Sequence, residues 1–191
     1  MPLWPRSGSS IGWLLAAAAE PTPDGWFSRQ AGALGWPAID ALRARRYALV
    51  GCGRNGHALA LQLAAWEPRE IVLIDPDTVE PGNRDAGIAF IDAMSAGSSH
   101  TATGRGSAKV HAMAEMVQLH APLTRIVALD APIESMRALR AAAECDVIIS
   151  ATDTDGARLC CAAVAQSFHR VHLDLGSLVS HDTQGKVALG A

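Results

Sequence analysis

The sequence predicts an α/β fold of the Rossmann-like, doubly wound kind, with a mostly parallel sheet and helices on both of its faces. Short apolar runs alternate with longer segments of helical character from residue 46 to residue 175. The first apolar run leads directly into a glycine-rich turn, Gly51-Cys52-Gly53-Arg54-Asn55-Gly56. Since such alternation builds parallel sheets, a ligand is expected at the carboxyl ends of the strands.

The opening strand–helix–strand unit carries the strongest pattern. Buried strands are predicted over residues 47–50 and 70–74, and residues 57–66 between them place leucines among alanines, as in a helix that lies on a sheet. Glu67-Pro68 should end that helix. The second strand runs into Asp75, which lies nineteen positions after Gly56.

This spacing has a physical explanation. Glycines let the backbone turn tightly and approach a phosphate, and the helix that follows presents free N–H groups to that anion. An acid about twenty residues further on accepts a hydrogen bond from a ribose hydroxyl. We therefore predict that Gly51, Gly53 and Gly56 approach nucleotide phosphates and that Asp75 lies at the sugar.

The remaining chain continues the alternation. Helices are expected over 39–45, 109–120, 134–143 and 155–168, and strands over 125–129, 145–150, 171–175 and 186–189. Residues 1–25, with four prolines, are expected to be an irregular segment, and residues 26–191 one nucleotide-binding domain. A Gly- and Ser-rich loop is expected over 92–107, beside the site. Asp153 follows a predicted strand, as Gly51 and Asp75 do.

Composition narrows the functional class. A formal net charge of −3 and a pI near 6.1 give no electrostatic footprint for nucleic acid, and no stretch is long enough to span a bilayer. The four cysteines form no C-x-x-C pair, so neither zinc nor a disulfide framework is indicated, and a cytoplasmic location is expected. Residues 6–19 weakly imitate a secretory signal, with a short helix as the alternative.

Several motifs, taken in their order, resemble the ThiF/MoeB/HesA family of prokaryotic relatives of ubiquitin-activating enzymes. The resemblance covers roughly residues 26 to 190. The matching pieces are Phe27-Ser28-Arg29-Gln30, Val50-Gly51-Cys52-Gly53, Asp75-Pro76-Asp77-Thr78-Val79-Glu80, Asn83, Lys109, and Ala151-Thr152-Asp153 with Arg158.

The resemblance implies an activity and two cofactors. Family members bind ATP and Mg²⁺ and adenylate the C-terminal carboxylate of a ubiquitin-like or sulfur-carrier protein. It also implies that Asp153 binds the magnesium and that Arg29 reaches into the neighbouring subunit's site. A homodimer would then be part of the active protein.

The resemblance further assigns the nucleotide contacts. Asp75 and Asp77 are expected at the nucleotide, with Asp75 at the ribose, and Asn83 and Lys109 at the phosphates. Each of these residues also has a simpler explanation. Asp75 and Asp77 could begin a polar turn, Lys109 could be solvated, Asp153 could cap a helix and Arg29 could pair with a surface carboxylate.

The chain also departs from the family pattern. Ala86 stands where the family commonly has an arginine, although Arg84 could supply that group. Bulky Arg54 and Asn55 replace small residues inside the glycine turn, and Arg54 could bind phosphate or obstruct it. These departures favour a non-catalytic nucleotide-binding or dimerisation module as an alternative. The strand–glycine turn–helix pattern also permits a second alternative, an NAD-dependent oxidoreductase.

Overall fold

The structure is a computed structural model of residues 1–191, and it describes residues 27–83, 85–87, 89, 107–176, 179–181 and 187–189. The chain divides into two compact units, residues 1–44 and residues 45–191. The predicted irregular segment 1–25 lies outside the described residues, as does all of the predicted loop 92–107 except Ser107.

The first unit contains two helices, α2 (Ser28–Leu34) and α3 (Trp36–Arg43). Its buried residues include Phe27 and Ile39, and the guanidinium carbon of Arg43 lies 4.8 Å from the centre of the Phe27 ring. Helix α3 begins three residues before the predicted start at residue 39, because Pro37 in its first turn favours a helix start. Helix α2 was not predicted.

The second unit is built on a five-stranded sheet in the order β3-β2-β1-β4-β5. All four neighbouring pairs are parallel. The chain winds outward from β1 to β3 and then returns to β4 and β5, so the carboxyl ends of β1 and β4 form the point at which the winding reverses. The strands are β1 (Arg46–Val50), β2 (Glu70–Ile74), β3 (Arg125–Leu129), β4 (Val147–Ser150) and β5 (Val171–Asp174).

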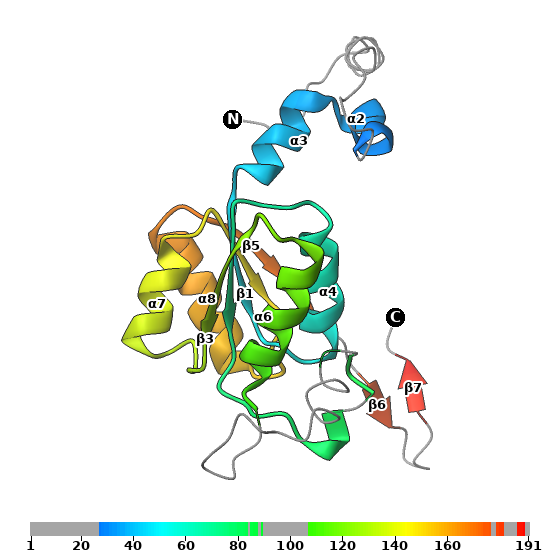
Figure 1. Cartoon of the computed structure of the whole chain (residues 1–191). Coiled ribbons are helices and arrows are strands. Elements are labelled where there is room, and N and C mark those ends of the chain that lie inside the picture. Colours follow the sequence, from blue (N-terminus) through cyan, green and yellow to red (C-terminus); the bar gives the residue numbers. More distant parts are fainter. Residues whose placement is uncertain are drawn as a thin grey trace. The chain divides into compact units, whose positions relative to one another are not determined.

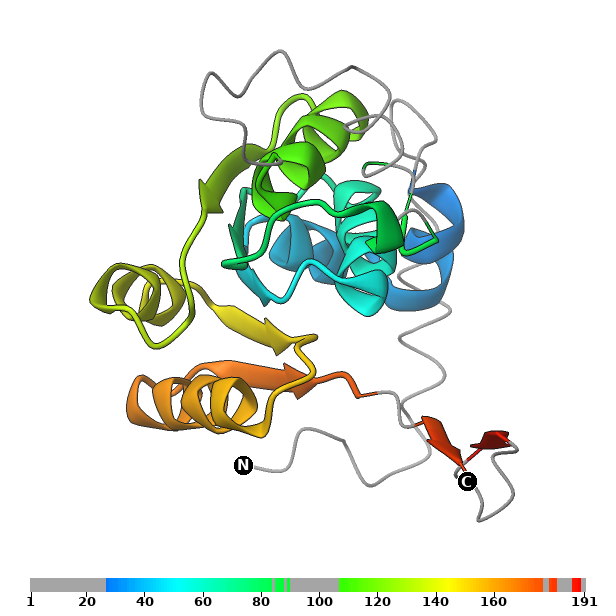
Figure 2. The ribbon, with the colours of Figure 1, turned by 90° about the horizontal axis from the view of Figure 1, so that it is seen from below.

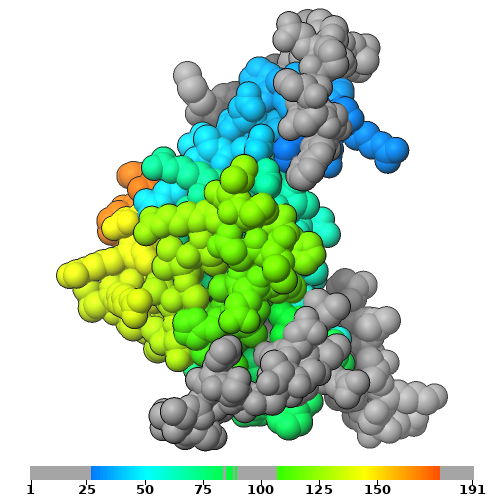
Figure 3. Space-filling model, viewed as in Figure 1, coloured from blue at the N-terminus to red at the C-terminus, as the bar shows by residue number. Residues whose placement is uncertain are grey.

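Helices cover both faces of this sheet, which confirms the predicted fold class. Helices α4 (Arg54–Ala64) and α6 (Lys109–His120) lie on one face, and α7 (Met136–Ala143) and α8 (Asp155–Ser167) lie on the other (Figures 1 and 2). In the space-filling view of Figure 3, α6 and α7 form much of the visible surface of this unit.

The core on each face follows the alternation of the strand side chains. Leu49 and Leu73 pack with α4 and α6, whereas Val50 and Ile74 pack with α7 and α8. The central strands β1 and β2 are therefore apolar on both faces, as buried parallel strands are. The carboxyl ends of β1 and β2 are therefore anchored by packing on both faces of the sheet.

Two helices of the second unit begin at residues other than the predicted ones. Helix α4 begins at Arg54, three residues before the predicted start at residue 57, because Gly53 is the residue that caps it. Helix α7 begins at Met136 rather than at residue 134, because the hydroxyl of Ser135 accepts a hydrogen bond from the N–H of Ala138.

Three short elements complete the described chain. The last predicted strand is present as β7 (Val187–Leu189), which pairs antiparallel with β6 (Val179–His181), a strand that was not predicted. A single 3₁₀ turn, η2 (Pro81–Asn83), follows β2. In the part of the chain that the structure describes, no helix has the length and hydrophobicity needed to cross a bilayer.

Candidate functional site

The glycine turn between β1 and α4 is fixed by close backbone contacts. Gly51 has a φ of 96°, and a Cβ on it would lie 2.7 Å from the backbone oxygen of Ala151. A Cβ on Gly56, inside the first turn of α4, would lie 1.9 Å from the backbone oxygen of Gly51. Gly53 is different, since a Cβ on it would have no neighbour within 4 Å. Two glycines therefore allow close packing and the third leaves open space at the start of α4.

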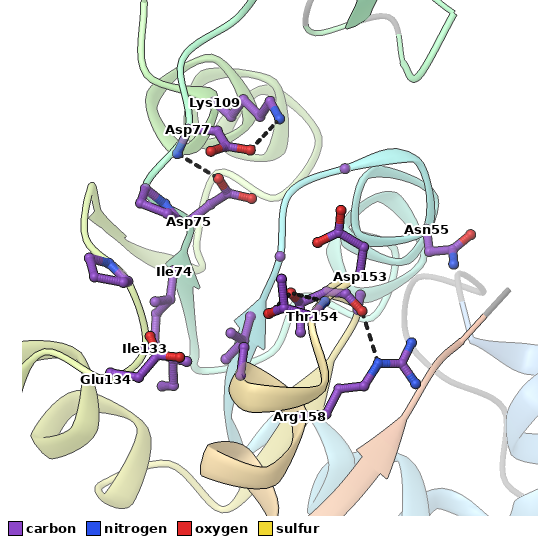
Figure 4. Close-up of a pocket in the computed structure, with 18 of the residues that line it drawn as sticks. Asn55, Ile74, Asp75, Asp77, Lys109, Ile133, Glu134, Asp153, Thr154 and Arg158 are labelled. Atoms are coloured by element: carbon purple, nitrogen blue, oxygen red, sulfur yellow. Dashed lines mark hydrogen bonds and ion pairs between the residues drawn. The ribbon is translucent and has the colours of Figure 1, made fainter. Parts of the chain in front are cut away.

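A cleft of about 480 Å³ opens at the carboxyl ends of β1, β2 and β4. Six of the residues that the sequence singles out line it, namely Gly51, Gly53, Asp75, Asp77, Lys109 and Asp153. Figure 4 shows Asp75, Asp77 and Lys109 on one side of the glycine turn and Asp153 and Arg158 on the other. The fold thus brings together groups that lie up to about a hundred residues apart in the sequence. This agrees with the expectation that ligands bind at the carboxyl ends of parallel strands, called here the strand-end rule.

Asp75 closes β2 and holds the glycine turn in place. Its Oδ2 accepts a hydrogen bond from the backbone N–H of Cys52 at 2.6 Å, and its Oδ1 accepts one from the backbone N–H of Asp77 at 2.8 Å. Burial raises the pKa of the Asp75 carboxyl group, although the two backbone N–H groups act to lower it. A carboxylate offers about four lone-pair sites, so two remain for a ribose hydroxyl. The ribose contact itself stays a prediction.

Lys109 is tied to Asp77 by two hydrogen bonds. The Lys109 Nζ lies 2.8 Å from the Asp77 Oδ2, and the backbone N–H of Lys109 donates to the backbone oxygen of Asp77 at 2.9 Å. Burial opposes the charged form of Lys109, but the hydrogen bond with Asp77 and the charges of both aspartates outweigh it, so the pKa of Lys109 is raised. Lys109 is therefore a cation at neutral pH, with its head group at the cleft.

Asp153 lies on the turn between β4 and α8, where Arg158 supports the backbone. The Nε of Arg158 donates to the backbone oxygen of Thr152 at 3.0 Å, and its Nη1 donates to Asp174 at 3.0 Å. The Asp153 side chain is exposed, and with the described residues its carboxylate makes no hydrogen bond or ion pair. Asp153 therefore presents an uncommitted carboxylate to the cleft.

This donor set fits magnesium that arrives with a nucleotide. Mg²⁺ keeps several waters and is usually held by one or two carboxylates together with substrate phosphates. Asp153 supplies such a carboxylate at the cleft. No group of three or more His, Cys, Asp or Glu side chains forms a metal cage among the described residues.

The remaining predicted residues lie elsewhere. Asn83 does not line the cleft, and its Oδ1 accepts from the backbone N–H of Glu80 at 2.9 Å, so it closes the 3₁₀ turn η2. Gly56 lies behind the turn, in α4. Arg84 lies outside the described residues. Arg29 is an exposed residue of α2 in the first unit.

Sequence reasoning missed several residues of the cleft wall. Ile133 and Glu134 follow β3 and line the cleft, and Ile133 is buried. Val50 and Ile74, which end two of the predicted strands as the last residues of β1 and β2, complete an apolar wall. The strand-end rule could have found Ile133 and Glu134, because β3 is the third parallel strand to end at this edge.

Arg54 and His57 connect α4 to the segment after η2. The Arg54 Nη2 lies 2.7 Å from the Asp85 Oδ2 and its Nη1 donates to the Asp85 backbone oxygen at 3.1 Å. The His57 Nε2 accepts from the backbone N–H of Ala89 at 3.3 Å, and a Cβ on Gly87 would lie 2.3 Å from the His57 ring. His57 is buried, and this burial lowers the pKa of the ring.

The cysteines are not set up as nucleophiles. Burial raises the pKa of Cys52 well above its ordinary value, and it raises the pKa of Cys145 and Cys161 to about 12. Cys160, which is half-buried, also has a pKa raised by burial. Since the thiolate is the reactive form, these thiols are poor nucleophiles at neutral pH.

A glycine turn, a helix N-terminus and strand-end charges at the switch point of a doubly wound sheet are features of the class of Rossmann-like α/β domains. The family model described as "ThiF family" matches residues 27–187. The chain therefore belongs to the ThiF family. A comparison of the sequence with curated proteins finds no match.

Solved structures with the same fold include two Escherichia coli proteins. The tRNA N6-threonylcarbamoyladenosine dehydratase TcdA, solved in complex with ATP, is 21% identical with a TM-score of 0.65, over 87% of this chain and 66% of TcdA. MccB, solved with ATP, is 17% identical with a TM-score of 0.64, over 83% of this chain and 45% of MccB. The chain thus spans less than two thirds of the length of these proteins, and at these identities the likeness concerns the fold.

Proposed function

We propose that this chain binds ATP together with Mg²⁺ in the strand-end cleft and adenylates a carboxylate of a peptide or protein substrate. One observation carries the proposal. The open Gly53 position at the start of α4 shares a single cleft with the cation Lys109 and the uncommitted carboxylate Asp153, in a chain of the ThiF family. Similar structures of TcdA and MccB were solved with ATP, which supports this choice of nucleotide.

The cleft divides into regions that suit the parts of ATP. The apolar wall of Val50, Ile74 and Ile133 suits an adenine base, because buried apolar side chains favour an aromatic ring over water. The free lone pairs of Asp75 suit the ribose. The N-terminus of α4, open at Gly53, and the Lys109 ammonium suit the phosphates.

The reaction would exchange one bond to phosphorus for another. A substrate carboxylate oxygen attacks the α-phosphorus, the bond from that phosphorus to the bridging oxygen of the β-phosphate breaks, and pyrophosphate leaves as an acyl adenylate forms. Bound Mg²⁺ would neutralise phosphate charge. Both reactants are anionic, so this chain's contribution is positive potential from Lys109 and the α4 N-terminus, together with positioning.

The substrate we favour is the C-terminal carboxylate of a ubiquitin-like or sulfur-carrier protein. MccB was also solved with MccA, at 16% identity and a TM-score of 0.67, over 94% of this chain and 54% of MccB. We further propose that the protein acts as a homodimer in which Arg29 of one subunit enters the cleft of the other. Sedimentation of wild-type protein, and activity recovered by mixing Arg29→Ala with Asp153→Ala subunits, test that arrangement.

The test of the function is ATP binding by calorimetry, with and without Mg²⁺, followed by pyrophosphate exchange with candidate carrier proteins. Asp153→Ala should lose the magnesium-dependent part of binding and all exchange while its circular dichroism stays unchanged. Exchange that persists in Asp153→Ala would overturn the assignment. Tight ATP binding without exchange for any carrier would favour the non-catalytic module, and NADH binding in place of ATP would favour the oxidoreductase.

A further inference from the structure

The charged side chains that line the cleft include more acids than cations, which disfavours the binding of an anion. Among the described residues that line it, four are acids, Asp75, Asp77, Glu134 and Asp153, and three are cations, Arg54, Lys109 and Arg158. A phosphate chain therefore needs cations that are not already neutralised by protein carboxylates. The three cations differ in this respect.

Arg158 and Lys109 are both committed to other groups. Arg158 donates from Nε, Nη1 and Nη2 to the Thr152 oxygen, to Asp174 and to the Leu175 oxygen, with 26% of its side chain exposed. The Lys109 ammonium is paired with Asp77, with 11% of its side chain exposed. Arg158 would have to break these contacts to reach a ligand. The Lys109 ammonium keeps two further N–H donors at the cleft, but Asp77 already offsets part of its charge.

Arg54 is held much more loosely. Its side chain is 65% exposed, and the Asp85 side chain to which it is bound is 73% exposed. Exposed ion pairs of this kind contribute little to stability, because water competes for both charges. Arg54 can therefore exchange Asp85 for another anion at small cost.

The position of Arg54 also suits a phosphate. It is the first residue of α4, directly after Gly53, and it lines the cleft. A guanidinium group can bind phosphate oxygens through two N–H donors. On Asp85 the two terminal nitrogens of Arg54 already donate to two different oxygens, the backbone oxygen and Oδ2. Ala86, next to Asp85, brings no charge of its own to this side.

We propose that Arg54 is a phosphate-binding residue of this cleft and that Asp85 holds it beside the glycine turn until the nucleotide phosphates take the place of that carboxylate. The inference rests on the proposed ATP-binding function and names the residue that receives the phosphate chain. Arg54, a bulky residue in a glycine turn where small residues are usual, thereby has a role in binding the ligand. Asp85 acts as a positioning residue that competes with the ligand.

The experiment compares the binding of Mg-ATP and of adenosine by calorimetry in wild type, Arg54→Ala, Asp85→Asn and the double variant. Arg54→Ala should weaken Mg-ATP binding about tenfold or more and leave adenosine binding unchanged, because only the phosphates contact the guanidinium. Asp85→Asn should tighten Mg-ATP binding by up to about fivefold, and only when Arg54 is present.

Arg69→Ala is the matched control. Arg69 is an exposed arginine that directly precedes β2, at the amino ends of the strands and so away from the cleft at their carboxyl ends. It should bind Mg-ATP as wild type does. If Arg54→Ala perturbs α4, Arg54→Gln keeps the length of the side chain and gives the same comparison.

The outcomes separate this inference from the proposed function. Wild type that binds Mg-ATP, with Arg54→Ala and Arg54→Gln equally tight, overturns the role of Arg54 and leaves the ATP site standing. Tightening by Asp85→Asn in the absence of Arg54 would show a general charge effect and overturn the role of Asp85. Wild type that binds no ATP overturns the proposed function and this inference together.

Discussion

Lys109 and Asp77 are joined twice, by an ion pair of 2.8 Å between Nζ and Oδ2 and by a backbone hydrogen bond of 2.9 Å. The two residues lie 32 positions apart and connect the end of β2 to the start of α6. The backbone bond fixes where α6 begins, and the side-chain bond directs the ammonium group to the cleft. The ion pair can therefore be tested separately from the fold.

We expect Lys109→Ala to weaken Mg-ATP binding about tenfold or more, because a charged hydrogen bond to phosphate is lost. Loss of the ion pair should change the free energy of unfolding by no more than about 1 kcal/mol, since Asp77 is mostly exposed. Calorimetry and urea denaturation measure the two effects. If Lys109→Ala bound Mg-ATP as tightly as wild type, Lys109 would not be part of the phosphate site. Arg137→Ala is the control, because Arg137 is an exposed cation that does not line the cleft, and its affinity for Mg-ATP should equal that of wild type.

Asp75→Asn should lower the free energy of unfolding by about 1–3 kcal/mol, because an amide can accept from only one of the two backbone N–H groups and leaves the other without an acceptor. Urea denaturation measures this change. Asp153→Asn serves as the control and should unfold like wild type, as its side chain is exposed. Equal stability of the Asp75 and Asp153 variants would contradict the structural role of Asp75.

Gly51→Ala and Gly56→Ala should each destabilise the fold by about 1–3 kcal/mol or more, because the new methyl group meets backbone atoms that cannot move aside. Gly53→Ala should be close to wild type in stability, since that position is open and its φ is −72°. Thermal unfolding followed by circular dichroism compares the three variants. A Gly56→Ala protein as stable as Gly53→Ala would mean that the turn is packed differently.

His57 should make stability depend on pH. Its pKa is lowered by burial from an ordinary value of 6.5, so the unfolded chain takes up a proton at a pH where the folded protein does not. The stability that neutral His57 contributes is complete above about pH 6.5 and is lost as the pH falls below it. Urea midpoints between pH 7.5 and pH 5 measure this loss.

His57→Gln should flatten that part of the pH profile. His111→Gln, which changes an exposed histidine on α6, should keep it. A wild-type profile retained in His57→Gln would assign the pH dependence to other groups.

The sequence by itself determined the five strands of the parallel sheet, the helices that alternate with them, and most of the charged residues at the strand ends. Apolar runs such as Tyr47–Val50 and the glycine turn are local patterns, set by burial of parallel strands and by backbone sterics, so they can be recognised without knowledge of distant neighbours. Helix α6 and strand β3 have the predicted bounds, 109–120 and 125–129, for this reason. The family followed from the same local motifs.

Only the tertiary structure decided how the side chains are used. The Arg54–Asp85 pair, the hydrogen bond from Cys52 to Asp75 and the contact of His57 with Gly87 join residues 23 to 31 positions apart. The contacts of Arg54 and His57 depend on how the segment after β2 packs against α4. No repeating pattern in the sequence predicts that packing. Asn83 shows the same point, since its amide oxygen closes its own turn instead of facing the cleft. Local patterns thus fix where a group lies along the chain, and long-range packing fixes the partner it meets.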